Sequence, residues 1–187
     1  MSIKIIVLIF IYSHFVESGP IRNGIYSLIP THNGYYWREF YGEVPPDADP
    51  GGRDRSGNPT YIGQVFGKDL GLLPATIVRG SPNVTTTWGT SAVQSDKNVK
   101  ILCSNDQDKF KWIPTKAGDV HMLSNCHLVN GGYEGDYLLH IGRVNHEEEV
   151  IIGKVFSHIV EIGGLWIPYG RFPVWYGTYQ ILAFDCR

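Results

Sequence analysis

Two acidic residues follow glycine pairs in this sequence of 187 residues. Asp54 ends the segment Gly51-Gly52-Arg53-Asp54, and Glu134 ends the segment Gly131-Gly132-Tyr133-Glu134, 80 residues later. Glycine lets the backbone come close to a ligand and adopt positive φ. A carboxylate in such a place can accept hydrogen bonds from two hydroxyls of a hexose, and a lysine such as Lys154 can donate to the same hydroxyls. The chemistry that these residues favour is recognition of vicinal hydroxyls.

Each candidate also has an interpretation that needs no ligand. In that interpretation Glu134 and Lys154 form an ordinary surface ion pair, which contributes little to stability. Asp54 is then a turn residue that holds its own loop, and the glycines are turn positions. Glu149 lies in an acidic, solvated loop, from which its side chain can also lean toward Lys154. The residues alone leave both interpretations open.

Motifs for catalysis and for metal binding are absent from the sequence. It contains no Gly-x-Ser-x-Gly, no P-loop and no Gly-x-Gly-x-x-Gly that opens a helix. Its seven histidines show no H-x-x-x-H or H-x-H spacing. We therefore predict no catalytic residue, no metal site and no cofactor, and we expect that the protein is not an enzyme.

The first 18 residues have the pattern of a secretory signal peptide. Lys4 precedes a continuous apolar run from Ile5 to Phe10, and cleavage is predicted after Ser18. An uncleaved membrane anchor is the alternative, but a span needs about 20 apolar residues. The apolar segment is interrupted by polar and charged residues, namely Ser13, His14 and Glu17. We therefore predict a secreted, extracellular protein with no membrane span after cleavage.

Secretion decides how the cysteines and one asparagine are interpreted. An oxidising route permits disulfides, but the three cysteines Cys103, Cys126 and Cys186 leave one thiol over, and their pairing stays open. Asn83-Val84-Thr85 is an N-glycosylation sequon in a polar stretch. We predict glycosylation at Asn83.

Composition indicates the fold class. Hydrophobic residues make up 43% of the chain, aromatic residues 13% and charged residues only 18%, a balance opposite to that of disordered chains. The net charge of -2 argues against a nucleic-acid partner. The 22 glycines and 11 prolines separate short runs rich in β-branched and aromatic residues, so we predict an all-β fold with few helices. The runs are residues 60–65, 76–78, 137–144, 149–155, 164–169 and 177–184.

Landmarks recur along the chain in the same order, twice. Each series opens with an aromatic cluster that is expected in the core, Tyr35-Tyr36-Trp37 and then Phe110-Lys111-Trp112. Each ends on a strand-like run with an Ile-Leu pair, and those pairs are 80 residues apart. We predict two repeats, residues 34–104 and 109–187. Units of about 70 residues would be marginal alone, so we expect a core shared by the two repeats.

The order of these landmarks resembles that of the DM-nine domain family, some members of which are mannose-binding lectins. The matching segments of the second repeat are Gly131-Gly132-Tyr133-Glu134, Ile141-Gly142-Arg143-Val144-Asn145-His146, Gly153-Lys154 and Trp166-Ile167-Pro168-Tyr169-Gly170. Those of the first repeat are Trp37, Pro46-Asp47-Ala48, Gly51-Gly52-Arg53-Asp54, Tyr61-Ile62-Gly63 and Leu72-Leu73-Pro74. The resemblance implies two pseudo-symmetric repeats of short antiparallel strands, packed as one unit.

The resemblance also implies a sugar site in each repeat, built from the acid after the glycine pair and from the lysine of a Pro-Gly-Lys segment. The second repeat keeps Glu134 and Lys154, although Ile152 replaces the proline. The first repeat keeps Asp54 but has Thr76 where the lysine is expected. The ligand-binding candidates are therefore Glu134, Lys154, Asp54 and Glu149.

The partner implied by the resemblance is a mannose-type glycan or a microbial surface polysaccharide, as in pattern recognition by innate immunity. A homodimer would present two copies of the intact site and so strengthen weak binding. The alternative is a secreted interaction or structural protein whose sugar site has decayed and which binds a protein partner. The missing lysine of the first repeat favours that alternative.

Overall fold

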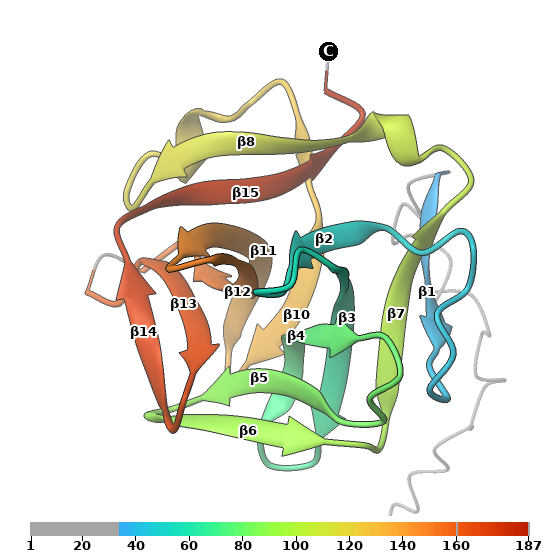
Figure 1. Ribbon diagram of the computed structural model, residues 1–187. Coiled ribbons are helices and arrows are strands. Elements are labelled where there is room, and N and C mark those ends of the chain that lie inside the picture. The colour runs from blue at the N-terminus through green and yellow to red at the C-terminus, as the bar shows by residue number, and fades with distance from the viewer. Residues whose placement is uncertain (1–33, 160, 187) are drawn as a thin grey trace, which may run out of the picture. The chain divides into compact units, whose positions relative to one another are not determined.

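The computed structural model describes residues 34–159 and 161–186, and the predicted signal peptide lies outside the described residues. Fifteen strands account for most of this part of the chain, and its helical segments are two 3-10 turns, η1 (Gln107–Lys109) and η2 (Val120–Met122). The strands are joined by hydrogen bonds into one antiparallel sheet system (Figure 1). The all-β prediction is confirmed.

The strands fall into two series with the same order. The first series is β1 (Tyr35–Glu39), β2 (Pro50–Arg53), β3 (Pro59–Gly67), β4 (Gly71–Val78), β5 (Val84–Trp88), β6 (Ser91–Ser95) and β7 (Val99–Ser104). The second is β8 (Phe110–Lys116), β10 (Asn130–Glu134), β11 (Tyr137–His146), β12 (Glu149–Phe156), β13 (Gly164–Tyr169), β14 (Phe172–Tyr176) and β15 (Thr178–Phe184), with the short β9 (His127–Leu128) between β8 and β10.

The pairing of the strands is the same in both series. β3 pairs with β2, β4 and β7, and β11 pairs in the same way with β10, β12 and β15. The hairpins β5–β6 and β13–β14 correspond, and so do the outer pairs β1–β7 and β8–β15, which can be followed in Figure 1. Register matches as well, since Trp37 lies opposite Leu102 and Trp112 opposite Leu182. The two series are pseudo-symmetric repeats.

Two reciprocal pairings join the repeats. β2 of the first repeat pairs with β12 of the second, and β10 of the second pairs with β4 of the first. The glycine pairs lie within β2 and β10 rather than in turns, so their assignment to turn positions is wrong. A Cβ on Gly52 would overlap the carbonyl oxygen of Val150, and one on Gly132, at φ +129, would overlap that of Leu72. The glycines are therefore required for the close approach of one repeat to the other.

The hydrophobic core is shared by the repeats, as predicted. One buried cluster combines Ile62 and Leu102 of the first repeat with Ile141 and Leu182 of the second. Two further clusters are centred on the strands of the first repeat and of the second, respectively. Because the central cluster draws on both halves, neither repeat buries its apolar face by itself.

Sequence patterns predicted strands at β3, β4, β7, β11, β12, β13 and β15 and missed the others, among them β5, β6 and β14. β5 contains three threonines, β6 is short with serine at both ends, and β14 contains Pro173. Their threonines, serines and proline resemble in composition the turn segments around them. These hairpins nevertheless border the candidate site described below.

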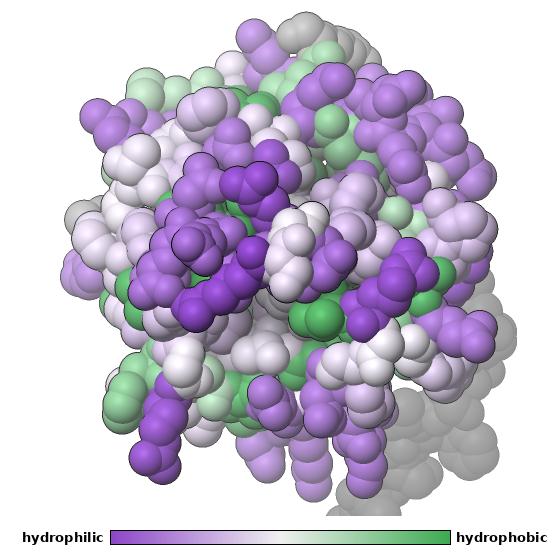
Figure 2. All heavy atoms as spheres, viewed as in Figure 1, coloured by the Kyte–Doolittle hydropathy of each residue, from purple (hydrophilic) through white to green (hydrophobic). Residues whose placement is uncertain are grey.

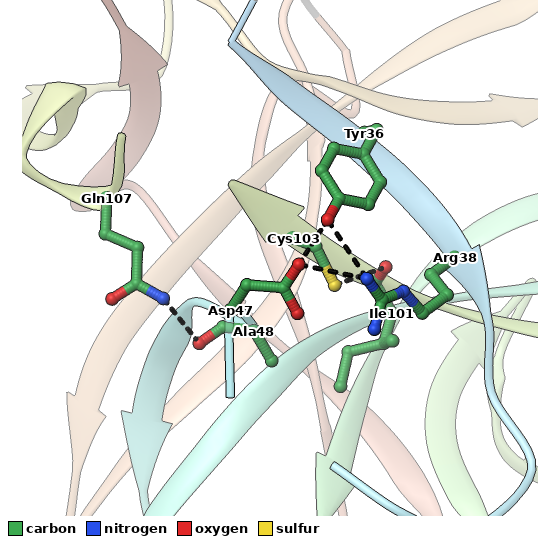
Figure 3. A network of polar contacts seen from close by, with 7 residues as sticks. All are labelled: Tyr36, Arg38, Asp47, Ala48, Ile101, Cys103 and Gln107. Atoms are coloured by element: carbon green, nitrogen blue, oxygen red, sulfur yellow. Dashed lines mark hydrogen bonds and ion pairs between the residues drawn. The ribbon is translucent and has the colours of Figure 1, made fainter. Parts of the chain in front are cut away.

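A polar network attaches β1 to the loop before β2 (Figure 3). The hydroxyl of Tyr36 and the guanidinium of Arg38 both hydrogen-bond the carboxylate of Asp47, and the Arg38 Nη2 to Asp47 Oδ2 distance is 3.0 Å. Gln107 donates to the carbonyl oxygen of Ala48 over 3.2 Å, which holds the same loop from its other side. Tyr36 is partly exposed because its hydroxyl takes part in this network. The prediction that Tyr36 lies in the core is therefore wrong.

The structure resolves the cysteine pairing that the sequence left open. Cys126 and Cys186 form a disulfide across 60 residues of chain and tie the C-terminal strand to the segment before β9. Cys103 is a free thiol, fully buried in β7, and burial raises its pKa to about 11. A thiol with so high a pKa is a poor nucleophile.

The surface seen in Figure 2 is mainly hydrophilic, and apolar residues occupy small separate areas, one of them over the tips of β13 and β14. Among residues 34–159 and 161–186, no helix has the length and apolar character needed to cross a bilayer.

Candidate functional site

Glu134 and Lys154 come together in the structure. Glu134 ends β10, and Lys154 lies in the middle of β12, opposite Ile141 of β11 and Trp166 of β13. Their side chains form an ion pair in which the lysine is only 3% exposed and the glutamate 16%. The pair therefore lies at the bottom of a depression rather than on the surface, so the surface ion-pair interpretation does not describe it.

The first repeat completes the site. Lys154 Nζ donates to the carbonyl oxygen of Thr87 over 2.9 Å, and the backbone N–H of Gly89 donates to Glu134 Oε1 over 3.2 Å. Thr87 belongs to β5, and Gly89 forms the turn between β5 and β6 at φ +51. The ion pair of the second repeat is thus held by a hairpin of the first.

Burial and the ion pair shift the pKa of Lys154 in opposite directions. Removal from water lowers the pKa of Lys154, and the neighbouring Glu134 carboxylate partly offsets that effect. A buried ammonium is costly unless its N–H groups are satisfied. The carboxylate, the Thr87 carbonyl and the ring of Phe156, whose centroid is 5.4 Å from Nζ, supply that compensation.

A cavity of about 480 Å³ opens over the ion pair. Its lining is mostly apolar and consists of Gly89, Thr90, Glu134, Lys154, Phe156, Ile162, Trp166, Phe172 and Pro173. The ring of Trp166 lies in this wall, where it can pack against a sugar. Tyr133 is exposed on β10 and is not part of the lining.

A smaller cavity of about 160 Å³ is the counterpart in the pseudo-symmetric position. Asp54 and Thr76 line it, and Thr76 lies opposite Ile62 as Lys154 lies opposite Ile141. Both carboxylate oxygens of Asp54 accept hydrogen bonds from Asn58, over 2.8 and 3.0 Å. Thr76 donates to the carbonyl oxygen of Ile152 over 3.3 Å. The counterpart of the ion pair is thus absent, and Asp54 holds its own turn.

Glu149 lines the smaller cavity and does not approach Lys154. Its Oε1 is 3.3 Å from Nε of Arg55, and the Nη2 of Arg55 also contacts Glu147 and the Tyr169 hydroxyl, both over 2.6 Å. The hydroxyl of Tyr169 donates to Glu147 over 2.6 Å. The carboxylates of Glu147 and Glu149 are therefore both paired with Arg55.

Asn83, the predicted glycosylation site, lies in the exposed turn between β4 and β5. The turn is closed by Ser81, whose hydroxyl accepts from the N–H of Asn83 and donates to its carbonyl oxygen. The side chain is therefore in a place that a glycan can occupy.

A model of the DM9 repeat, the DM-nine family, matches residues 66–176, more than half of the chain. The chain belongs to the DM9 repeat family. The matched segment runs from β3 to β14 and includes Glu134 and Lys154.

Among solved structures, the chain is similar to the crystal structure of the nematode sperm cell motility protein MFP2B, with a TM-score of 0.59 and 12% sequence identity. The similarity covers 82% of this chain and 47% of the other, so the chain spans about half the length of that structure. At this identity the similarity concerns the fold. No curated protein matches the sequence.

Sequence reasoning missed the part of this DM9 site that comes from the first repeat. Thr87, Gly89 and Thr90 are far from Glu134 and Lys154 in sequence and reach them only through the packing of the repeats. Phe172 was missed because its strand was not predicted. The one available signal was the correspondence of Trp88-Gly89 with Tyr169-Gly170, which marks two equivalent turns.

Proposed function

We propose that this DM9 protein is a secreted carbohydrate-binding protein and that it binds mannose-type glycans in the Glu134–Lys154 cavity. The observation that carries the proposal is the buried ion pair at the bottom of that cavity. An ion pair held in fixed geometry presents an acceptor and a donor side by side, which matches two vicinal hydroxyls. The apolar wall can pack on the C–H face of a sugar ring.

A single site of this kind binds weakly, because the sugar loses its hydration as it gains these hydrogen bonds. The smaller cavity lacks the lysine, so we propose that each chain contributes one site and that a homodimer provides avidity. Recognition of microbial surface polysaccharide in innate immunity is a use that suits multivalent, weak sites. We propose no catalytic role.

Isothermal titration of the purified protein with methyl α-mannoside tests the site. Alanine variants are unsuitable because Lys154 is buried, so we choose Glu134→Gln, which keeps the shape and removes the charge. The matched control is Glu39→Gln, which breaks the exposed ion pair between Glu39 and Lys100, 3.4 Å long. Loss of binding in Glu134→Gln alone, with the far-UV circular dichroism unchanged, is expected. Equal binding by all three proteins contradicts the site.

Secretion is tested separately. We expect the mature protein in the medium of expressing cells to begin at Gly19 and to lose mass on treatment with an N-glycosidase, unless Asn83 is replaced by Gln. Retention of residues 1–18 on a membrane-bound product contradicts this part of the proposal.

A second candidate function is a secreted interaction or structural protein with a protein partner. The absence of a lysine at Thr76, and the closed charge cluster beside it, favour this candidate. The solved neighbour is named for sperm cell motility, which is compatible with a scaffold that acts through protein contacts. This candidate predicts no saturable mannoside binding, together with a protein that co-purifies with the chain in stoichiometric amounts.

A further inference from the structure

We infer that, among mannose-type ligands, the Glu134–Lys154 cavity binds glycosides with an apolar aglycone, an alkyl chain or an aromatic ring, more tightly than unsubstituted sugars. This inference rests on the proposed sugar-binding function of the same cavity and names its ligand class. Three observations carry it, namely the few hydrogen-bonding groups left for a ligand, the aromatic wall and the contrast with the counterpart cavity.

Few polar groups of the cavity remain available to a ligand. Of the three N–H donors of Lys154, one is used by Glu134 and one by the Thr87 carbonyl, which leaves one. Glu134 already accepts from Lys154 and from Gly89. The indole N–H of Trp166 donates to the carbonyl oxygen of Ile162 over 3.0 Å and is not free for a ligand. One donor of Lys154, the remaining lone pairs of Glu134 and the hydroxyl of Thr90 are the side-chain groups open to a ligand, and they are fewer than the hydrogen bonds that all hydroxyls of a hexose can make.

The rest of the wall is apolar and includes residues that the fold does not require to be apolar. Phe172 is 68% exposed, and Ile162 is 38% exposed. An exposed phenylalanine at the rim of a cavity gains little from packing within its own chain. It gains when a ligand places an apolar group against it, and a hydroxyl in the same place would be left without a partner.

The counterpart cavity shows that the scaffold itself does not demand aromatic residues here. Register places Thr85 where the larger cavity has Trp166, because Thr85 lies opposite Thr76 and Trp166 lies opposite Lys154. In the same way Ser91 corresponds to Phe172, since each lies opposite the last residue of the preceding strand. Aromatic residues thus occur in the cavity that has the ion pair, and small polar residues occupy the equivalent positions of the repeat that lacks it.

The test compares three glycosides that share a sugar and differ in aglycone. Methyl, phenyl and n-octyl α-mannosides are titrated into the purified protein, the octyl compound below its micellar concentration. An aglycone that buries about 60 Å² of apolar surface tightens binding about tenfold. We expect at least that ratio over the methyl compound for phenyl or octyl. A larger gain for octyl indicates a glycolipid-type ligand, and a larger gain for phenyl a phenolic glycoside.

The variant Phe172→Ser copies Ser91, the residue at the equivalent register position of the first repeat, at an exposed position. Tyr41→Ser, at a position 90% exposed and outside the lining, is the matched control. We expect Phe172→Ser to lower the ratio of phenyl or octyl mannoside affinity to methyl mannoside affinity about fivefold. Equal affinity of the wild-type protein for all three glycosides overturns this inference and leaves the sugar site standing. The inference is also overturned if phenyl or octyl mannoside binds more tightly than methyl mannoside but Phe172→Ser leaves that ratio unchanged. Failure of all three to bind overturns the proposed function itself.

Discussion

The ion pair between Glu134 and Lys154 predicts a strong non-additivity in stability. The lysine is 3% exposed, so Glu134→Gln leaves an ammonium buried without its carboxylate. Breaking a buried pair in this way costs about 3 kcal/mol. Lys154→Met removes the charge that is hardest to bury, and it leaves a glutamate that is 16% exposed and still held by the N–H of Gly89. We expect about 1–2 kcal/mol for that variant.

The double variant Glu134→Gln/Lys154→Met removes both charges and keeps the volume of both side chains. Its remaining cost is the unsatisfied carbonyl of Thr87, about 1 kcal/mol. The double variant is therefore expected to be more stable than Glu134→Gln alone, and the cycle gives a coupling of about 3 kcal/mol.

Urea unfolding of the four proteins, with the disulfide intact, measures the cycle. In thermal unfolding, 3 kcal/mol corresponds to about 6–12 °C in Tm for a chain of this size. Additive losses within about 0.5 kcal/mol would refute the reasoning, because they would mean that the two side chains do not depend on each other.

Three further predictions concern the frame around the site. Burial raises the pKa of Asp49 to about 7, above its ordinary value of 3.8, while the charge of Arg143 opposes the shift. Between these two pKa values the folded protein keeps a proton on Asp49 that the unfolded chain releases. The free energy of unfolding therefore falls as the pH rises from about 4 to 7, by at most about 4 kcal/mol. Urea titrations at several pH values measure this fall, and Asp49→Asn is expected to remove it. Reduction of the Cys126–Cys186 disulfide, which closes 60 residues, lowers the free energy of unfolding by about 4 kcal/mol, and an unchanged urea midpoint would contradict this. Gly132→Ala places a Cβ against a carbonyl oxygen at φ +129, so we expect a loss of more than about 3 kcal/mol or no soluble protein, and a stable variant would show that β10 can move.

The two repeats could be predicted because short sequence segments mark equivalent positions in each of them. The aromatic clusters, the glycine pairs and the Ile-Leu pairs keep their order, and register shows that they occupy equivalent places in β1 and β8, β2 and β10, and β7 and β15. The correspondence of Thr76 with Lys154 followed from the same order. Each depends on residues close together in sequence, where strand periodicity and turn chemistry act.

What the sequence did not indicate depends on the packing of one repeat against the other. Gly89 and Thr87 reach Glu134 and Lys154 only because β2 pairs with β12 and β10 with β4. The lysine is buried for the same reason, although a lysine in a strand is normally expected at the surface. Glu149 is the first residue of β12, and its side chain pairs with Arg55 of the first repeat. The disulfide likewise joins segments that no local pattern relates.

The central claim is that the cavity over Glu134 and Lys154 recognises the hydroxyls of a mannose-type glycan. Retention of the mature protein on a panel of immobilised glycans, with and without free mannose as competitor, tests it most directly. We predict retention on mannose-type glycans that free mannose abolishes and that Glu134→Gln loses. Absence of retention on every glycan, by a protein whose circular dichroism and thermal unfolding show that it is folded, would contradict the claim.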